Sequence, residues 1–154
     1  MSAGAVTLAD ITSADWSLEL DSTAGAGPGS GIGKVVQGIS DITQCIQIIL
    51  TTPKGSDPLR PTFGIDLWQY LDAPINQATP AIVREVTEAI MHWEPRVNVV
   101  SVKVAPVLDG TTQSGAHLSI STTWQLKLTQ VPAGAVGTQQ VYTTTVIIPQ
   151  AQGF

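Results

Sequence analysis

Residues 79–97, TPAIVREVTEAIMHWEPRV, contain a helix signal followed at once by the start of a strand. Thr79 is a good N-cap and Pro80 suits the first helical position, so a helix is predicted to begin here. Apolar residues then recur at helical spacing and form one stripe: Ile82, Val83, Val86, Ala89, Ile90 and Trp93. Because Pro95 disfavours helical geometry at the residue before it, the helix is expected to end near Trp93.

The sequence after Pro95 predicts strands. Over residues 97–108 the valines change parity near Val99 and Val100, which indicates a β-bulge, and the inward side chains after it are expected to be Val100, Val102, Val104 and Leu108. The next strand alternates regularly, with the inward set Leu118, Ile120, Thr122, Trp124, Leu126 and Leu128. A last strand is predicted over 141–148, where Pro149 stops it.

The part of the chain before residue 79 predicts two further helices and a loop. Asp41 followed three residues later by Gln44 is typical of a helix start, and the stripe after it is Ile42, Cys45, Ile46 and Ile49. A short helix is expected over 65–71 and a half-buried strand over 16–20. Residues 22–33 are glycine-rich and predict a surface loop. A phosphate-binding loop is not expected there, because the motif spacing is not met.

These patterns together predict an α+β fold. About three helices in residues 40–93 are expected to pack on a small antiparallel or mixed sheet formed mainly by residues 97–148. One domain over residues 1–154 is expected, with an irregular segment 1–15 and the loop 22–33.

The composition of the 154 residues narrows the class of function. Seven Lys and Arg face twelve Asp and Glu, for a formal net charge of −5, and charged residues are only 12% of the chain. Nucleic-acid binding is therefore not expected, since it requires a cationic stripe. So little charge suggests that partner proteins cover much of the surface. No signal peptide or membrane-spanning run is recognised, so the chain is expected to be made in the cytosol, without a membrane partner.

Catalytic and metal-binding residues are not indicated. One cysteine and two histidines make no metal-ligand cluster, and no cofactor motif is present. Glycoside hydrolysis needs two carboxyl groups across a cleft. The candidates Glu85, Glu88 and Glu94 are close in sequence, but the first two fall on the polar face of the predicted helix, where solvated charge is ordinary. We expect no catalytic residue.

The corner Glu94-Pro95-Arg96 has two interpretations. In an extended chain Glu94 and Arg96 project to the same side, with the proline fixing the turn between them. The pair is either a local ion pair that orders the corner, or a docking feature for another subunit. The residues alone leave both open.

The ordered set of motifs resembles a known family. Asp41-Ile42-x-Gln44-x-Ile46-x-x-Ile49-Leu50-x-Thr52, then Pro61-x-Phe63-Gly64, then Trp93-Glu94-Pro95-Arg96-Val97 resemble the baseplate wedge and sheath-initiator family of contractile phage tails, to which the wedge component of type VI secretion baseplates also belongs. The similarity runs roughly from Trp16 to Leu128. One departure is that Gly55 is followed by Ser56-Asp57, where the family usually has Gly-Glu-Arg.

The resemblance implies a structural protein of the virion tail baseplate, assembled in the host cytoplasm in several copies around the tail axis. The implied partners are baseplate wedge proteins, the tail sheath protein, and tail tube or hub proteins. Glu94, Pro95 and Arg96 carry over as the recognition corner, with Phe63 and Gly64 beside it in the motif set. An uncharged strand edge tends to accept foreign strands, so we expect the sheath to pair with residues 141–148, through Val141, Thr143, Thr145 and Ile147. The alternative is a peptidoglycan-degrading, lysozyme-like enzyme, since members of the family are sometimes labelled so.

Overall fold

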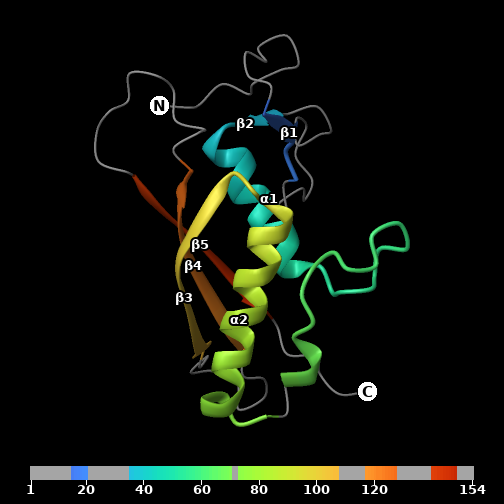
Figure 1. The fold of residues 1–154 in the computed structure, drawn as a ribbon, viewed down its shortest axis with the longest axis vertical. Coiled ribbons are helices and arrows are strands. Elements are labelled where there is room, and N and C mark those ends of the chain that lie inside the picture. The colour runs from blue at the N-terminus through green and yellow to red at the C-terminus, as the bar shows by residue number, and fades with distance from the viewer. Residues whose placement is uncertain (1–14, 21–34, 71–72, 108–116, 128–139, 149–154) are drawn as a thin grey trace, which may run out of the picture. The chain divides into compact units, whose positions relative to one another are not determined.

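A computed structural model describes residues 15–20, 35–70, 73–107, 117–127 and 140–148 (Figure 1). The chain divides into two compact units, residues 1–45 and 46–154. The interpretation of the chain as one domain stays a prediction. Leu108, Leu128, and the segments 1–14 and 22–33 lie outside the described residues.

The first unit contains a short antiparallel pair of strands, β1 (Trp16–Leu18) and β2 (Val35–Gln37), in which Trp16 is opposite Gln37. The predicted strand over 16–20 is thus shorter than expected. Its apolar side chains are also exposed, not half-buried: Trp16, Leu18 and Leu20. After β2, Gly38 adopts a positive φ of 59°, a conformation that favours glycine, and the chain enters α1 (Ile39–Thr51).

The predicted cap of this helix is wrong. The helix begins at Ile39, because the turn at Gly38 sets its start, and Asp41 lies buried within the first turn. Gln44 makes no capping box either. Its Nε2 donates to the Leu18 carbonyl at 2.7 Å and to Ser17 Oγ at 3.0 Å, and its Oε1 accepts from the Leu20 amide at 2.8 Å. Gln44 therefore holds the β1 segment, and Cys45 beside it is half-buried.

The second unit contains α2 (Ile75–Trp93) and a three-stranded antiparallel sheet in the order β3-β4-β5. The strands are β3 (Val97–Val107), β4 (His117–Leu126) and β5 (Val141–Ile148). In Figure 1, α2 lies against one face of this sheet. Its buried core includes Ile46, Leu50, Val86, Ile90, Val97, Ile120 and Trp124. The α+β class is confirmed, and the sheet is antiparallel throughout, not mixed.

The predicted number of helices is too high. Of the predicted helix over 65–71, the described residues 65–70 form only one 3-10 turn, η2 (Trp68–Tyr70), since a helix of this length has too few hydrogen bonds to persist. The predicted start of α2 is also wrong. The helix begins at Ile75, where the Pro74 carbonyl accepts from the amides of Gln77 and Ala78, and Pro80 lies inside it. Its end at Trp93 is as predicted.

The strand pattern is largely confirmed. The register of β3 shifts between Val99 and Ser101, which is the predicted bulge. Val100 was predicted to face inward, and this is wrong: it is the extra residue of the bulge and is 53% exposed. In β4 the residues Ile120, Thr122 and Trp124 are buried, as expected.

Candidate partner-binding site

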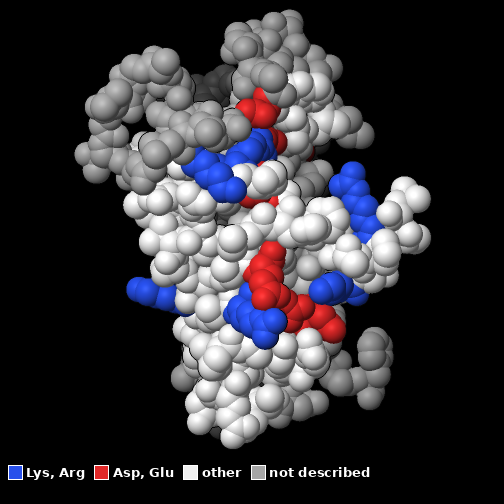
Figure 2. All heavy atoms as spheres, in the orientation of Figure 1, with Lys and Arg blue, Asp and Glu red and all other residues white. Residues whose placement is uncertain are grey.

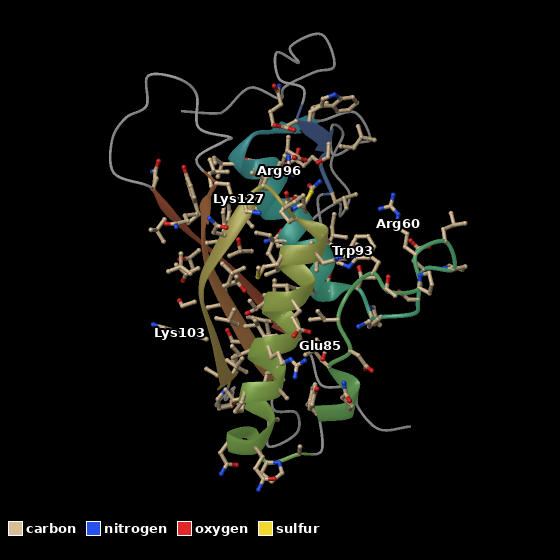
Figure 3. All side chains as sticks on the ribbon, viewed as in Figure 1. Arg60, Glu85, Trp93, Arg96, Lys103 and Lys127 are labelled. Atoms are coloured by element: carbon tan, nitrogen blue, oxygen red, sulfur yellow. The ribbon has the colours of Figure 1, made fainter. Side chains whose placement is uncertain are left out.

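The corner Glu94-Pro95-Arg96 joins α2 to β3 and is closed by a salt bridge. Arg96 Nε donates to Glu94 Oε1 at 2.6 Å and Arg96 Nη2 donates to Glu94 Oε2 at 2.8 Å. The exposed fractions of the two side chains are 19% for Arg96 and 4% for Glu94. Glu94 thus has both oxygens occupied by one guanidinium in a buried position, the strong bidentate geometry of this pair. Arg96 is labelled in Figure 3.

The backbone of the corner is also held. The Glu94 amide donates to the Ile90 carbonyl at 2.8 Å, and the Lys127 amide donates to the Arg96 carbonyl at 3.0 Å. The second bond ties the corner to the residue that follows β4. Pro95 is exposed, whereas Glu94 is not. A partner at this corner would therefore contact Pro95 and the outer part of Arg96. The buried Glu94 carboxylate contributes by holding the Arg96 guanidinium in place.

Phe63 and Gly64 lie next to the corner through Trp93. The Phe63 ring meets the Trp93 ring edge to face, with centroids 5.1 Å apart, and His92 meets Trp93 in the same way at 4.7 Å. Gly64 has a φ of 90°, and a Cβ there would lie 2.1 Å from the carbonyl oxygen of Thr52. Only glycine allows this approach. The motif that ends at Thr52 and the motif Pro61-x-Phe63-Gly64 are therefore brought together in space.

The chain directly after Phe63 and Gly64 is held by hydrogen bonds from two consecutive amides. The Ile65 amide donates to the Thr52 carbonyl at 3.0 Å, and the Asp66 amide donates to Glu85 Oε1 at 2.7 Å. Thr52 appeared in the sequence only as part of the family motif, and Glu85 only as a solvated charge. No local pattern could reveal their role, because both contacts join residues far apart in the chain.

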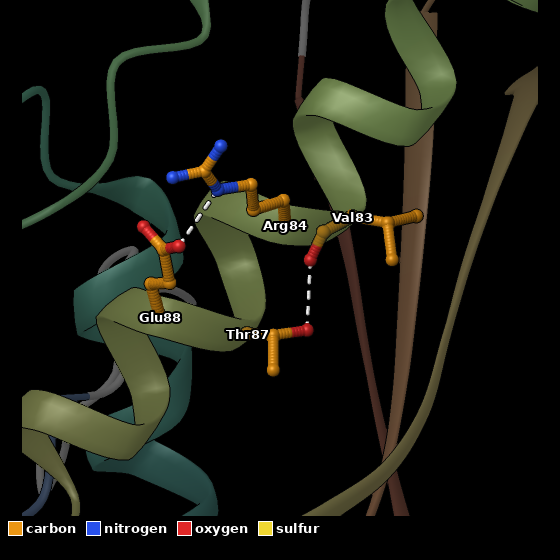
Figure 4. A network of polar contacts seen from close by, with 4 residues as sticks. All are labelled: Val83, Arg84, Thr87 and Glu88. Atoms are coloured by element: carbon orange, nitrogen blue, oxygen red, sulfur yellow. Dashed lines mark hydrogen bonds and ion pairs between the residues drawn. The ribbon is translucent and has the colours of Figure 1, made fainter.

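A pocket of about 310 Å³ lies between this turn and α2. It is lined by Lys54, Thr62, Gly64, Glu85, Glu88, Ala89, His92 and Trp93. Glu88 accepts from Arg84 Nε at 2.7 Å in an exposed pair on the helix surface (Figure 4). This hydrogen bond raises the pKa of the Arg84 guanidinium, which is charged in any case. The charged side chains that line the pocket are thus of both signs, and its two glutamates are engaged by groups outside the lining, Glu88 by Arg84 and Glu85 by the Asp66 amide.

The other predicted site residues lie along β5. Val141, Thr143, Thr145 and Ile147 are exposed, while Thr144 and Val146 face the core. On the exposed face of the sheet, Thr143 is opposite Thr123 and Thr145 is opposite Ser121. The hydroxyl oxygens of Thr145 and Ser121 are 3.0 Å apart. This face of the sheet is nearly uncharged, as is most of the surface visible in Figure 2.

The registers place the corner and the start of β5 at the same end of the sheet. Val97 follows the corner and is opposite Leu126, and the neighbouring Gln125 is opposite Val141. Two strand spacings, about 10 Å, separate the outer strands of such a sheet. The corner and β5 therefore flank one end of the sheet but belong to opposite edges.

The described residues contain no group of three His, Cys, Asp or Glu side chains that could hold a metal ion. Neither helix in the described ranges combines the length and the apolar character that a membrane span requires.

The chain matches a family model and is similar to two phage baseplate proteins. Residues 36–131 match the family of baseplate wedge protein gp25. The chain is similar to baseplate wedge protein gp25 of Enterobacteria phage T4, with 37% identity over 76 residues that make up 49% of this chain and 58% of the T4 protein. It therefore spans little more than half of that relative. It is also similar to baseplate protein W of Escherichia phage P2, with 36% identity over 92 residues, 55% of this chain and 77% of the P2 protein.

Among solved structures, the chain resembles a Geobacter sulfurreducens protein described as a candidate tail lysozyme. The TM-score is 0.54 and the identity 27%, over 73% of this chain and 93% of that one. The family match covers more than half of the chain and confirms the resemblance drawn from the motifs. The chain therefore belongs to the family of baseplate wedge protein gp25, and it is a structural protein of the phage tail baseplate.

Proposed function

We propose that this protein binds neighbouring wedge proteins and starts the tail sheath by accepting a sheath strand along β5. The observation that carries the proposal is the difference between the two outer strands of its sheet. In the described part of the chain, β5 pairs only with β4, so its other side offers main-chain donors and acceptors to a new strand. Such strand addition needs no particular partner sequence.

In its own described residues, the β5 edge has none of the sequence features that usually prevent strand addition. Its eight residues carry no charge and no proline, and they pair with β4 without a break in register. The β3 edge has three such features: the bulge after Val99, the exposed Lys103 and the proline Pro106. Extension of the sheet is therefore expected at β5 and not at β3.

Wedge binding is assigned to the surface around the corner. Within the corner, Pro95 and the outer part of Arg96 are accessible, and Phe63 packs against Trp93, the residue that precedes Glu94. Tail tube or hub proteins remain further partners in this proposal. The low charge of the protein is consistent with surfaces that are covered in the assembled baseplate.

Paired lysine substitutions on the two edges test the sheath role. Thr143→Lys with Thr145→Lys places two charges on β5, and Ser101→Lys with Ala105→Lys places two on β3 as the matched control. In tails assembled with each variant, the β5 pair is expected to give baseplates and tubes without sheath, and the control to give sheathed tails. Equal sheath assembly with both pairs contradicts the proposal. A thermal melt of each purified variant verifies that it folds.

A peptidoglycan-degrading enzyme is the second candidate, favoured by the solved relative described as a candidate tail lysozyme. The carboxylates support a non-enzymatic role instead. Glu94 is buried, and both of its carboxylate oxygens accept hydrogen bonds from Arg96. Glu85 accepts a hydrogen bond from the Asp66 main-chain amide, and Glu88 forms a solvent-exposed ion pair with Arg84. Purified protein is expected to leave a cell-wall suspension turbid. Clearing that Glu88→Gln abolishes, with the fold intact, contradicts this part of the proposal.

A further inference from the structure

The sequence of β5 is nearly symmetric in chemical type. Residues 141–147 are Val-Tyr-Thr-Thr-Thr-Val-Ile: two apolar side chains, three threonines, and two apolar side chains again. We infer that β5 pairs edge to edge with β5 of a second copy of this chain, in an antiparallel register centred on Thr144. This pairing needs neither a sheath nor a wedge protein, so it is independent of the function proposed above.

The register follows from which side chains share a face. Residues directly opposite each other in an antiparallel pair point to the same face of the sheet. Two β5 strands can therefore pair only when the numbers of opposite residues add to an even sum. Centred on Thr144, the pairing covers residues 141–147 of both copies.

In this register like side chains meet on the exposed face. Val141 of one copy is opposite Ile147 of the other, and Thr143 is opposite Thr145. The sheet already contains hydroxyl contacts of this type, since Ser121 Oγ and Thr145 Oγ1 are 3.0 Å apart. Paired threonines and paired aliphatic side chains both stabilise neighbouring strands.

The inner face is matched as well. Thr144 is opposite its own copy, and Tyr142 is opposite Val146, so apolar groups meet on both sides of the threonine. A shift of the register by two residues is less favourable, because either shift places a threonine opposite an aliphatic residue, Thr143 opposite Ile147 or Thr145 opposite Val141. The shift that is centred on Thr143 also shortens the overlap within β5 to residues 141–145.

Charge does not oppose the association. All residues of β5 are uncharged, and the lysine on the outer face of the sheet, Lys103, lies on β3, two strands away. The contact has two-fold symmetry, so every interaction occurs twice and the pair is closed. It joins two three-stranded sheets into one of six strands. Because the contact is a strand edge with a small area, the dimer is expected to dissociate on dilution.

The consequence is that free copies cover the edge that the sheath strand is proposed to use. An uncovered edge of this kind is prone to pair with unrelated strands. Self-pairing protects the protein before it is built into the baseplate, and it must be released before a foreign strand can add to β5.

Disulfide trapping tests the pairing and its register. In a Cys45→Ala background, Thr143→Cys and Thr145→Cys proteins are purified, oxidised separately and as an equal mixture, and separated on a non-reducing gel. Opposite residues lie about 5 Å apart in an antiparallel pair and diagonal residues about 7–8 Å. Cysteines more than about 7 Å apart cannot be bridged without backbone movement. The mixture is therefore expected to form covalent dimer several-fold faster than either variant alone.

Lys103→Cys and Ala105→Cys on β3 give the matched control, and this mixture is expected to form dimer no faster than its separate components. Circular dichroism melts verify that all variants fold. Equal rates in the mixture and in the single variants, absence of covalent dimer, or the same result on β3 each overturn the inference.

Discussion

Gly64 and Gly55 have nearly the same backbone conformation, with φ values of 90° and 88°, but different surroundings. A Cβ at Gly64 would lie 2.1 Å from the Thr52 carbonyl oxygen, whereas at Gly55 no atom lies within 4 Å. At either position, the positive φ alone makes alanine about 1–2 kcal/mol less favourable than glycine in the folded state. At Gly64 the close contact with Thr52 adds about 1–3 kcal/mol for overpacking. Comparison of the two substitutions therefore isolates the effect of the close approach.

We predict that Gly64→Ala lowers the free energy of unfolding by about 2–5 kcal/mol, the sum of both effects. Gly55→Ala is predicted to lower it by only about 1–2 kcal/mol. Urea denaturation of the two variants and the parent protein measures both values. Equal losses in the two variants would mean that the turn moves away from Thr52 without cost.

The buried salt bridge of the corner predicts a different pattern. Arg96→Ala leaves the Glu94 carboxylate buried without its guanidinium, and such a change typically costs about 3–5 kcal/mol. Replacing both partners by apolar residues, Glu94→Leu with Arg96→Met, is predicted to recover most of this loss, because no buried charge remains. Thermal and urea unfolding measure the single and double variants. A loss in the double variant as large as in Arg96→Ala would argue against this account.

The effect of Arg96→Ala on stability complicates its use in assembly experiments. Arg96→Ala alone confounds folding with docking, since the same side chain holds Glu94 in place. The folded double variant lacks the guanidinium but keeps the corner, so it is the suitable probe of wedge binding. Loss of wedge binding in this variant is the result that the docking role predicts.

At the scale of the strands, Thr122 and Thr144 are opposite each other on the inner face of β4 and β5 and differ in hydrogen bonding. Thr144 Oγ1 accepts from the indole Nε1 of the buried Trp124 at 2.9 Å. Thr122 Oγ1 is buried and has no hydrogen-bond partner among the described residues. Valine has nearly the shape of threonine, so it tests each hydroxyl with little change in packing.

We predict that Thr144→Val lowers the free energy of unfolding by about 1–3 kcal/mol, because it leaves the Trp124 indole without an acceptor. Thr122→Val is predicted to leave stability unchanged or raise it. Urea denaturation followed by tryptophan fluorescence measures both variants. A destabilised Thr122→Val protein would show that this hydroxyl has a partner outside the described residues.

The elements that the sequence predicts well are those with a regular local pattern. Alternation over residues 97–148 gives the strands and the change of parity at Val99, and Pro95 gives the end of α2. The start of α2 was not predictable in this way, because its N-cap residue is Pro74, whose side chain makes no capping hydrogen bond, and the first turn depends on the Pro74 carbonyl. Contacts between distant residues, such as Gln44 with Leu18 or Phe63 with Trp93, leave no periodic signal in the sequence.

In the whole molecule, the proposed sheath role depends on a difference between the two edges of one small sheet. The β5 edge is uncharged and regular, whereas the β3 edge is interrupted by a bulge, a lysine and a proline. The same sequence property that favours pairing with a sheath strand favours pairing with a second copy of β5. The two pairings exclude each other, so the assembled tail contains at most one of them at each copy.

A cryo-electron microscopy map of the intact tail, at a resolution that separates the strands, is the most direct measurement. We predict a strand of the sheath protein hydrogen-bonded along Val141–Ile148, so that the sheet of this protein continues into the first sheath ring. A map in which β5 faces solvent, or in which the foreign strand lies along β3, would contradict it.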